Sequence, residues 1–361
     1  MFNDEELAIL WFDYNDVGFL KTEKILEKFD KIDSIFDKNK VKSAIFKDES
    51  LNQIKEKLLN LDKEKFFETV LDEFYKYNIS AVTFASKNYP EKLKNIDEPP
   101  LVLYARGDIA LLGKKSIAIV GTRKPTTYGR IVTEKFTKEL SESGLVTVSG
   151  LAYGIDTIVA NSTIDAGGKT IAVLAGGLDS IYPSSNKGLA EKVVQCGGLL
   201  ISENRPKVKP LSFSFIKRNR IVSALGLGLL IVEAGKNSGT MSTAKHAIEQ
   251  GRELFVVPGN INSLQSEGTN NLIDEMPDTF TISPERILYR LKIKKKKQES
   301  QTVQVNLTEN EILNLLSNGE LSFDEICDKI KIKPAELSAC LIKMEMFGLI
   351  TKGQGNLYYK I

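Results

Sequence analysis

The stretch SIAIVGTRKPTTYGRIVTEKFTKELSESGLVTVSG, residues 116–150, decides the fold class of this chain. Two short apolar runs, 116–121 and 145–150, each end in glycine, and a stretch with helical spacing, 128–143, separates them. Continuous apolar runs without polar alternation are typical of strands that are buried on both faces. The stretch therefore predicts two parallel strands joined by a helical crossover.

The same texture repeats over the middle of the chain. Four further apolar runs alternate with helical stretches, at residues 169–177, 198–204, 227–235 and 252–259. Alternating strands and helices build an open, doubly wound parallel sheet. We therefore predict an α/β fold, an extended Rossmann-like sheet, over residues 79–290.

The flanking regions differ from this pattern. Residues 1–78 predict a small helical domain, because apolar residues recur at three-to-four spacing. A lysine block and polar residues predict a basic linker over 291–306. Residues 307–361 predict three helices and a hairpin, a winged helix, with a capping box from Ser322 to Glu325.

Composition excludes several classes of function. With 361 residues, 42% hydrophobic content and a net charge of +2, the chain resembles an ordinary globular protein, and any basic site must be local. The longest apolar run, 221–232, is too short to span a membrane, and the N-terminus is acidic, so we expect no membrane association. Three scattered cysteines indicate reduced thiols and a cytoplasmic location.

The only histidine, His246, limits the chemistry further. A Ser-His-Asp triad elsewhere and a multi-histidine metal site are both excluded. The sequence around His246 favours a packed or half-exposed position on a helix. We therefore predict no catalytic residue, no metal and no cofactor.

Glycine, serine and threonine collect where the predicted strands end. Because ligands bind beyond the carboxyl ends of strands in an open parallel sheet, the loops there are candidate site residues. Backbone N–H groups of such loops, and helix N-termini, favour phosphate. Neither a Walker A motif nor G-x-G-x-x-G is present, and each loop alone is also explained by tight turns. The candidates are Gly121, Thr122, Arg123, Lys124, Ser149, Gly150, Gly154, Ser238, Gly239 and Thr240.

A second group of candidates combines positive charge with aromatic rings. The segment from Asn204 to Val232 contains six cations and no carboxylate, and two phenylalanines stand among the cations. Cations follow a phosphate backbone, while ring faces stack on unpaired bases, so this pattern favours single-stranded nucleic acid. The alternative is that both rings belong to the core and the cations form a solvated face. The candidates are Lys209, Phe213, Phe215, Lys217, Arg218, Asn219 and Arg220.

Several of these segments together resemble the DprA/Smf family of DNA-processing proteins. The resemblance is carried by VGTRKPTTYG, SGLAYGID, GGKTIAVLAGGLDSIYP, FIKRNRIV and VEAGKNSGTMSTA, and it covers about residues 85–280. The N-terminal helices resemble that family's degenerate sterile-alpha-motif or helix-hairpin-helix domain. The last segment resembles the family's winged helix.

This resemblance implies a function in DNA recombination and natural transformation (competence). A family member of this kind binds single-stranded DNA, dimerises and loads a RecA-type recombinase onto the strand, without hydrolysing it. Gly121, Thr122, Arg123 and Lys209 would hold phosphate, and the aromatic–Arg–Asn–Arg motif would contact bases and backbone. The chain departs from the family pattern at Tyr153, Ala160 and Ile216, where arginine, histidine and proline are usual.

Two other functions compete with this one. A nucleotide-processing enzyme similar to lysine-decarboxylase-like phosphoribohydrolases would need a glutamate where Thr243 stands, and acid–base chemistry lacks its parts. A transcription regulator would read DNA through the winged helix. Its presumed recognition helix has Lys333 and Lys343 but also Glu336 and Glu345, which suits a major-groove reader poorly.

Overall fold

A computed structural model describes residues 2–294, 306–317, 319–347, 349–353 and 357–360. The chain divides into two units, Met1–Lys295 and Lys296–Ile361, which are described separately. The first unit begins with helices, four of which start at a polar cap, namely Asn3, Asp37, Asp48 and Asp62. These helices are α1 (Asp4–Tyr14), α2 (Phe19–Leu26), α3 (Lys38–Ser43), α4 (Glu49–Leu59) and α5 (Lys63–Tyr77), with a 3-10 turn at Ile32–Phe36.

An eight-stranded sheet follows, and it confirms the predicted fold class. The strand order is β1-β2-β6-β5-β4-β3-β7-β8. In this order, the six neighbouring strands β6, β5, β4, β3, β7 and β8 run parallel to one another. Strand β2 pairs antiparallel with both β1 and β6. The strands are β1 (Ser80–Thr83), β2 (Val102–Gly107), β3 (Ser116–Val120), β4 (Val146–Ser149), β5 (Thr170–Leu174), β6 (Leu199–Ser202), β7 (Gly228–Ile231) and β8 (Glu253–Val256).

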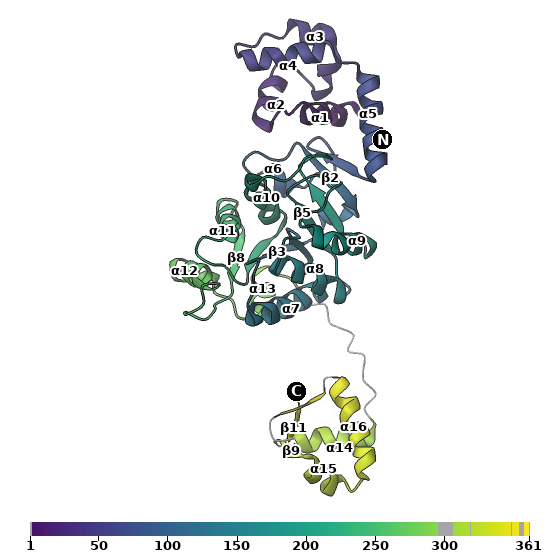
Figure 1. Ribbon diagram of the computed structural model, residues 1–361, viewed down its shortest axis with the longest axis vertical. Helices are drawn as coiled ribbons and strands as arrows, with labels where there is room; N and C mark the ends of the chain where they lie inside the picture. The colour runs from purple at the N-terminus through teal and green to yellow at the C-terminus, as the bar shows by residue number, and fades with distance from the viewer. Residues whose placement is uncertain (1, 295–305, 318, 348, 354–356, 361) are drawn as a thin grey trace. The chain divides into compact units, whose positions relative to one another are not determined.

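Helices cover both faces of the sheet (Figure 1). In β3, Ile117 and Ile119 pack against one layer, whereas Ala118 and Val120 belong to the cluster on the other face. Strands buried in this way explain the continuous apolar runs. The covering helices are α6 (Glu91–Lys94), α7 (Thr127–Glu142), α8 (Ile155–Asp165), α9 (Lys187–Gln195), α10 (Ser212–Leu225), α11 (Gly239–Glu249), α12 (Glu267–Glu275) and α13 (Pro284–Arg290).

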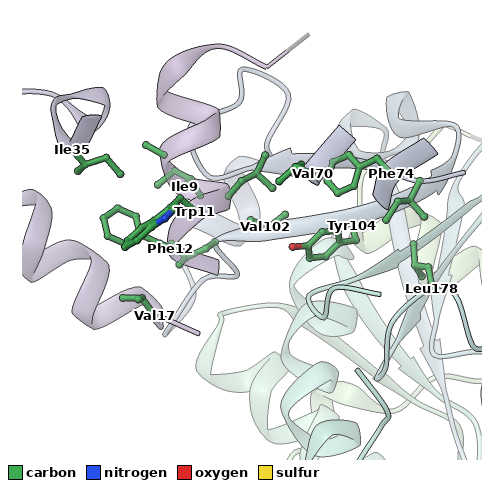
Figure 2. Close-up of a cluster of buried hydrophobic side chains, with 14 of the residues drawn as sticks. Ile9, Trp11, Phe12, Val17, Ile35, Val70, Phe74, Val102, Tyr104 and Leu178 are labelled. Atoms are coloured by element: carbon green, nitrogen blue, oxygen red, sulfur yellow. The ribbon is translucent and has the colours of Figure 1, made fainter. Parts of the chain in front are cut away.

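The N-terminal helices pack onto the sheet through strand β2. Figure 2 shows the buried cluster that joins them, with Phe74 of α5 edge-on to Tyr104 of β2 at a centroid distance of 6.0 Å. The Tyr104 hydroxyl donates a hydrogen bond to Oδ2 of Asp13 at 2.6 Å. Helices and sheet share one core here, and the boundaries 1–78 and 79–290 stay predictions.

This contact makes stability depend on pH. Burial raises the pKa of Asp13 from 3.8 to about 6, against the opposing effects of the Tyr104 hydrogen bond and the charge of Arg205. The folded chain therefore holds this proton more tightly than the unfolded chain. The stabilisation that this bound proton provides is complete below pH ~4 and is lost as the pH rises through about 6.

We expect Asp13→Asn to remove this dependence, because asparagine still accepts the bond from Tyr104 without a charge. The variant should be about 3 kcal/mol more stable than the parent at neutral pH and nearly equal to it below pH ~4. Denaturant unfolding at several pH values measures both. A variant that is less stable than the parent at neutral pH would contradict a raised pKa.

The second unit is the predicted winged helix. It consists of α14 (Leu307–Leu316), β9 (Leu321–Ser322), α15 (Phe323–Ile330), α16 (Pro334–Met346), β10 (Ile350–Lys352) and β11 (Leu357–Lys360). The capping box from Ser322 to Glu325 is present. Lys343, counted above among the cations of the recognition helix, forms a 2.7 Å ion pair with buried Glu309. Most of the predicted linker, 295–305, lies outside the described residues.

The cysteines and the histidine occupy partly buried positions in the described structure. Cys196, Cys327 and Cys340 are free thiols, and all three are partly buried. His246 lies on α11, partly buried, with Nδ1 3.5 Å from a carboxylate oxygen of Glu249. Within the described residues, no helix combines the length and the apolar character that crossing a bilayer requires.

Candidate nucleic-acid interface

A pocket of about 690 Å³ opens at the carboxyl ends of β3 and β7. These two strands are neighbours, but the chain leads from β3 to β4 on one side and from β7 to β8 on the other. Open α/β sheets bind ligands at such a switch point. The pocket is lined by the loops after both strands and by α10. Of the predicted site residues, it contains Gly121, Thr122, Arg123, Lys124, Gly150, Phe215, Arg218, Asn219, Ser238, Gly239 and Thr240.

The loop after β3 is fixed by a buried carboxylate. Glu233, which follows β7, accepts hydrogen bonds from the backbone N–H (2.9 Å) and the hydroxyl (2.6 Å) of Thr126. Its backbone carbonyl accepts the N–H of Thr122 at 2.7 Å. Because both ends of the loop are tied to one residue, Arg123 and Lys124 are presented at the pocket on a rigid support.

Two of the predicted contact residues, Gly154 and Ser149, do not line the pocket. Gly154 has a φ of +76°, and a Cβ there would lie 2.4 Å from the carbonyl oxygen of Thr122. Only glycine allows this approach, which lets the N–H of Ile155 donate to the same oxygen at 3.1 Å. Ser149 is buried at the end of β4 and does not line the pocket.

Arg218 lines the pocket with a buried side chain, and its role as a DNA contact stays a prediction. Its side chain is only 5% exposed, and Nη1 donates to the carbonyl oxygens of Gly150 (2.9 Å) and Val173. Beneath it, burial raises the pKa of Asp156, and the charge of Arg218 is the largest effect that opposes this rise. Asp156 also accepts the N–H groups of Gly150 and Ala152. The charge of Arg218 thus compensates a buried carboxylate.

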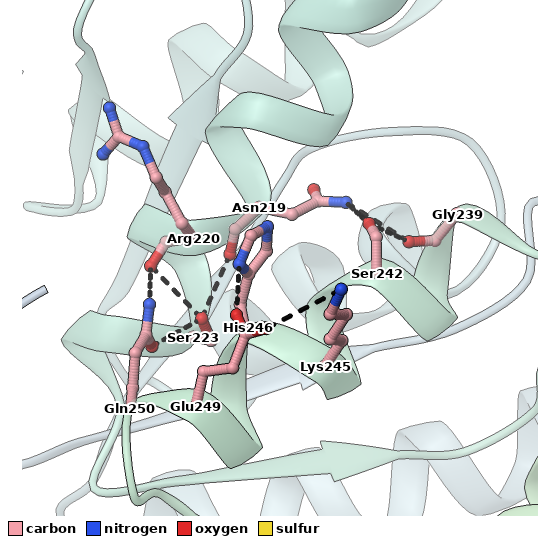
Figure 3. A network of polar contacts seen from close by, with 9 residues as sticks. All are labelled: Asn219, Arg220, Ser223, Gly239, Ser242, Lys245, His246, Glu249 and Gln250. Atoms are coloured by element: carbon pink, nitrogen blue, oxygen red, sulfur yellow. Dashed lines mark hydrogen bonds and ion pairs between the residues drawn. The ribbon is translucent and has the colours of Figure 1, made fainter. Parts of the chain in front are cut away.

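Arg220 and Asn219 are also engaged within the protein. Arg220 is 8% exposed and pairs with Glu203 at 2.5 Å, and exposed Lys217 lies 3.6 Å from the same carboxylate. The Asn219 amide donates to the hydroxyl of Ser242 at 3.0 Å and to the carbonyl of Gly239 (Figure 3). These bonds join α10 to the start of α11, and Asn219 lines the pocket beside them.

The expected field of six free cations is reduced further by the N-terminal helices. Arg205 pairs with Asp16 at 3.3 Å, and Lys207 pairs with Glu73 at 2.9 Å. These two cations dock the helical region onto the sheet. Lys209 is exposed, and no hydrogen bond or ion pair of its side chain occurs within the part of the chain that the structure describes.

The two phenylalanines have different surroundings. Phe213 is 63% exposed in the first turn of α10 and lies outside the pocket lining. Phe215 lines the pocket, with the Tyr182 ring 5.5 Å away and the guanidinium carbon of Arg123 5.3 Å from its centroid. Neither ring is part of the buried core, which removes the alternative that both are core residues.

Several lining residues were missed by the sequence analysis. Helix α11 begins at the pocket with its Ser238 cap, and Lys236 stands beside it as an exposed cation. The loop containing Lys236 was singled out, and a cation beside a helix N-terminus could have identified it. The other missed residues include Tyr182, Ile216, Leu264 and Gln265.

The chemistry of the pocket suits binding. Among the described residues that line it, Asp156 is the only carboxylate, and its oxygen accepts two backbone N–H groups. Thr243 is buried at the pocket wall. No group of three metal-ligating side chains occurs in the described ranges. Exposed cations, helix N-termini and rings together form a surface for a phosphate-containing chain.

Comparison with known proteins identifies the family of this chain. The family model for DNA recombination-mediator protein A matches residues 80–292, which include the whole pocket. The chain belongs to this family. The model for the DprA winged helix domain matches residues 296–356. The DNA processing protein DprA of Bacillus subtilis is 40% identical over 255 residues, 68% of this chain and 86% of that relative.

Other family members support the same assignment. DprA of Streptococcus pneumoniae is 41% identical over 187 residues, 52% of this chain and 66% of the relative. Its X-ray structure superimposes with a TM-score of 0.61 at 30% identity, over 80% of this chain and 93% of that one. A structure of DprA from Helicobacter pylori, described for its single-stranded DNA binding mode, gives a TM-score of 0.53 at 34% identity, over 59% and 95%.

Proposed function

We propose that this chain binds single-stranded DNA at the β3–β7 pocket and loads a RecA-type recombinase onto it. The observation that carries the proposal is the convergence of Arg123, Lys124 and Lys236 with the N-terminus of α11 and the Phe215 ring around one pocket. Phosphate contacts supply the affinity, and ring faces favour unpaired bases over a duplex. The described binding mode of the Helicobacter pylori relative supports this proposal.

The recombinase step rests on membership of a recombination-mediator family. We propose that the chain acts as a homodimer in the cytoplasm, during homologous recombination and uptake of DNA in natural transformation. The test is strand exchange by a RecA-type recombinase on DNA that is already covered by single-strand-binding protein. Adding this chain should shorten the lag before joint molecules form. An unchanged lag, with DNA binding intact, would restrict the function to DNA binding.

An enzyme of the phosphoribohydrolase type is less well supported. Such a reaction needs a carboxylate that is free to exchange a proton. Asp156 accepts the backbone N–H groups of Gly150 and Ala152, and Glu233 accepts two hydrogen bonds from Thr126. We therefore propose that the pocket binds its ligand without turnover.

The exposed ring of Phe213 provides a separate test of base stacking. We expect Phe213→Ala to lower single-strand affinity by about 1–3 kcal/mol, because one stacked base is lost. The slope of affinity against salt should stay constant, since no phosphate contact is removed. Fluorescence anisotropy across a salt series measures both values.

Leu211→Ala is the matched control for this variant. Leu211 is also exposed near the start of α10 and has no ring. Both variants should melt at the temperature of the parent. If the two variants bind DNA equally well, stacking on Phe213 is absent.

A further inference from the structure

The pocket has an outer wall on the loop that leads from β8 to α12. Residues 259–266 form a loop between β8 and α12, and its Leu264 and Gln265 line the pocket. Leu264 is 77% exposed although it is a large apolar residue. On α10, Ile216 lines the same pocket and is 54% exposed. Two exposed aliphatic side chains from separate elements thus face one polar, cation-bearing pocket.

The loop that carries Leu264 is held in place at both ends. The N–H of Gly259 donates to Oδ1 of Asn270 at 3.0 Å, and the Asn270 amide donates back to the carbonyl of Gly259 at 3.2 Å. After the loop, the N–H of Gly268 donates to the carbonyl of Ala234 at 2.8 Å. The exposure of Leu264 is therefore set by a fixed backbone, as in a preformed binding wall.

The backbone of this loop also lies directly against the loop that leads from β7 to α11. The Leu264 carbonyl oxygen is 3.1 Å from the point where a Cβ on Gly235 would stand. Gly235 begins the loop that leads through Lys236 to the N-terminus of α11. A nucleotide whose phosphate lies at α11 would therefore have its base beside Leu264.

The size of the pocket favours one unstacked nucleotide over a stacked run. At about 690 Å³ it falls in the range of roughly 300–1,000 Å³ typical of sites that enclose a single small molecule. Exposed apolar side chains around one concave site indicate a ligand with an apolar face. A nucleobase has two such faces, and its phosphate matches the nearby cations.

We propose that Leu264 and Ile216 hold a single unstacked base of the bound strand between them. This inference rests on the proposed function and assigns a base-contacting role to the loop 259–266. The test compares Leu264→Ala with Ile261→Ala in the full chain. Ile261 stands on the same loop, is 88% exposed and does not line the pocket, so it is a matched control.

Each variant is measured with a thymidine oligonucleotide and with an abasic strand of the same length and charge. Leu264→Ala should weaken binding of the thymidine strand roughly tenfold and leave binding of the abasic strand unchanged. Ile261→Ala should bind both strands as the parent does. Since Leu264 is exposed, the melting temperature of each variant should match the parent.

The outcomes separate this inference from the proposed function. If Leu264→Ala and Ile261→Ala bind the thymidine strand equally while the parent binds normally, Leu264 does not contact the base and the inference is wrong. An equal loss for both strands would also overturn it, because the contact would then be to the backbone. A parent chain that binds neither strand would overturn the proposed function itself.

Discussion

Arg218→Ala is expected to destabilise the first unit by about 3–5 kcal/mol, because it removes a buried cation whose charge offsets that of a buried carboxylate. The variant removes the guanidinium that compensates buried Asp156 and bonds to the carbonyls of Gly150 and Val173. Denaturant unfolding measures the loss. Stability equal to the parent, with weaker DNA binding, would make Arg218 a DNA contact as the sequence suggested.

The pH dependence of this variant gives an independent check. Without Arg218, the pKa of Asp156 should rise further, so the folded variant holds a proton that the unfolded chain has lost. The loss of stability relative to the parent should therefore be smallest below pH ~4. It should grow as the pH rises through the pKa of Asp156 in the folded variant. The double variant with Asp156→Asn should recover much of the loss, because asparagine still accepts from Gly150 or Ala152 without a charge.

The second large effect concerns DNA affinity. Replacing Arg123, Lys124 and Lys236 together by alanine should lower single-strand affinity by a hundredfold or more, since each charge-assisted contact contributes about 1.5–3 kcal/mol. The slope of log affinity against log salt should fall in magnitude by about 2. All three side chains are exposed or at the rim of the pocket, so the melting temperature should not change.

A control variant removes the same number of charges elsewhere. Lys114, Lys135 and Lys138 are exposed, and none of them lines the pocket. Their replacement by alanine should change affinity only slightly. If both triple variants lose affinity equally, the strand binds through diffuse charge and not at this pocket.

The sheet and its edge were predictable because local sequence determines them. Continuous apolar runs, such as 116–120, reflect burial on both faces, and glycine-rich loops mark the strand ends. The loop with Arg123 was therefore located correctly. Long-range pairing was not predictable: the sequence does not show that Asp16 and Glu73 meet Arg205 and Lys207.

The motif on α10 illustrates the limit most clearly. A run of basic residues is the same in sequence whether its charges face solvent or a buried carboxylate. Helical periodicity places Lys217 outward and Arg218 inward, but Asp156, the reason for a buried arginine, is 62 positions away in the chain. Leu264 was missed for a related reason, since a lone leucine in a polar loop has no pattern.

The central claim is that the pocket binds unpaired DNA, and one measurement tests it most directly. The affinity of the full chain for a labelled single strand and for a duplex of the same sequence is compared across a salt series. With three or four cations in contact, the single-strand slope should be about −2 to −3, and the single strand should bind more tightly at every salt concentration. Equal affinity for the duplex, or an affinity independent of salt, would contradict the claim.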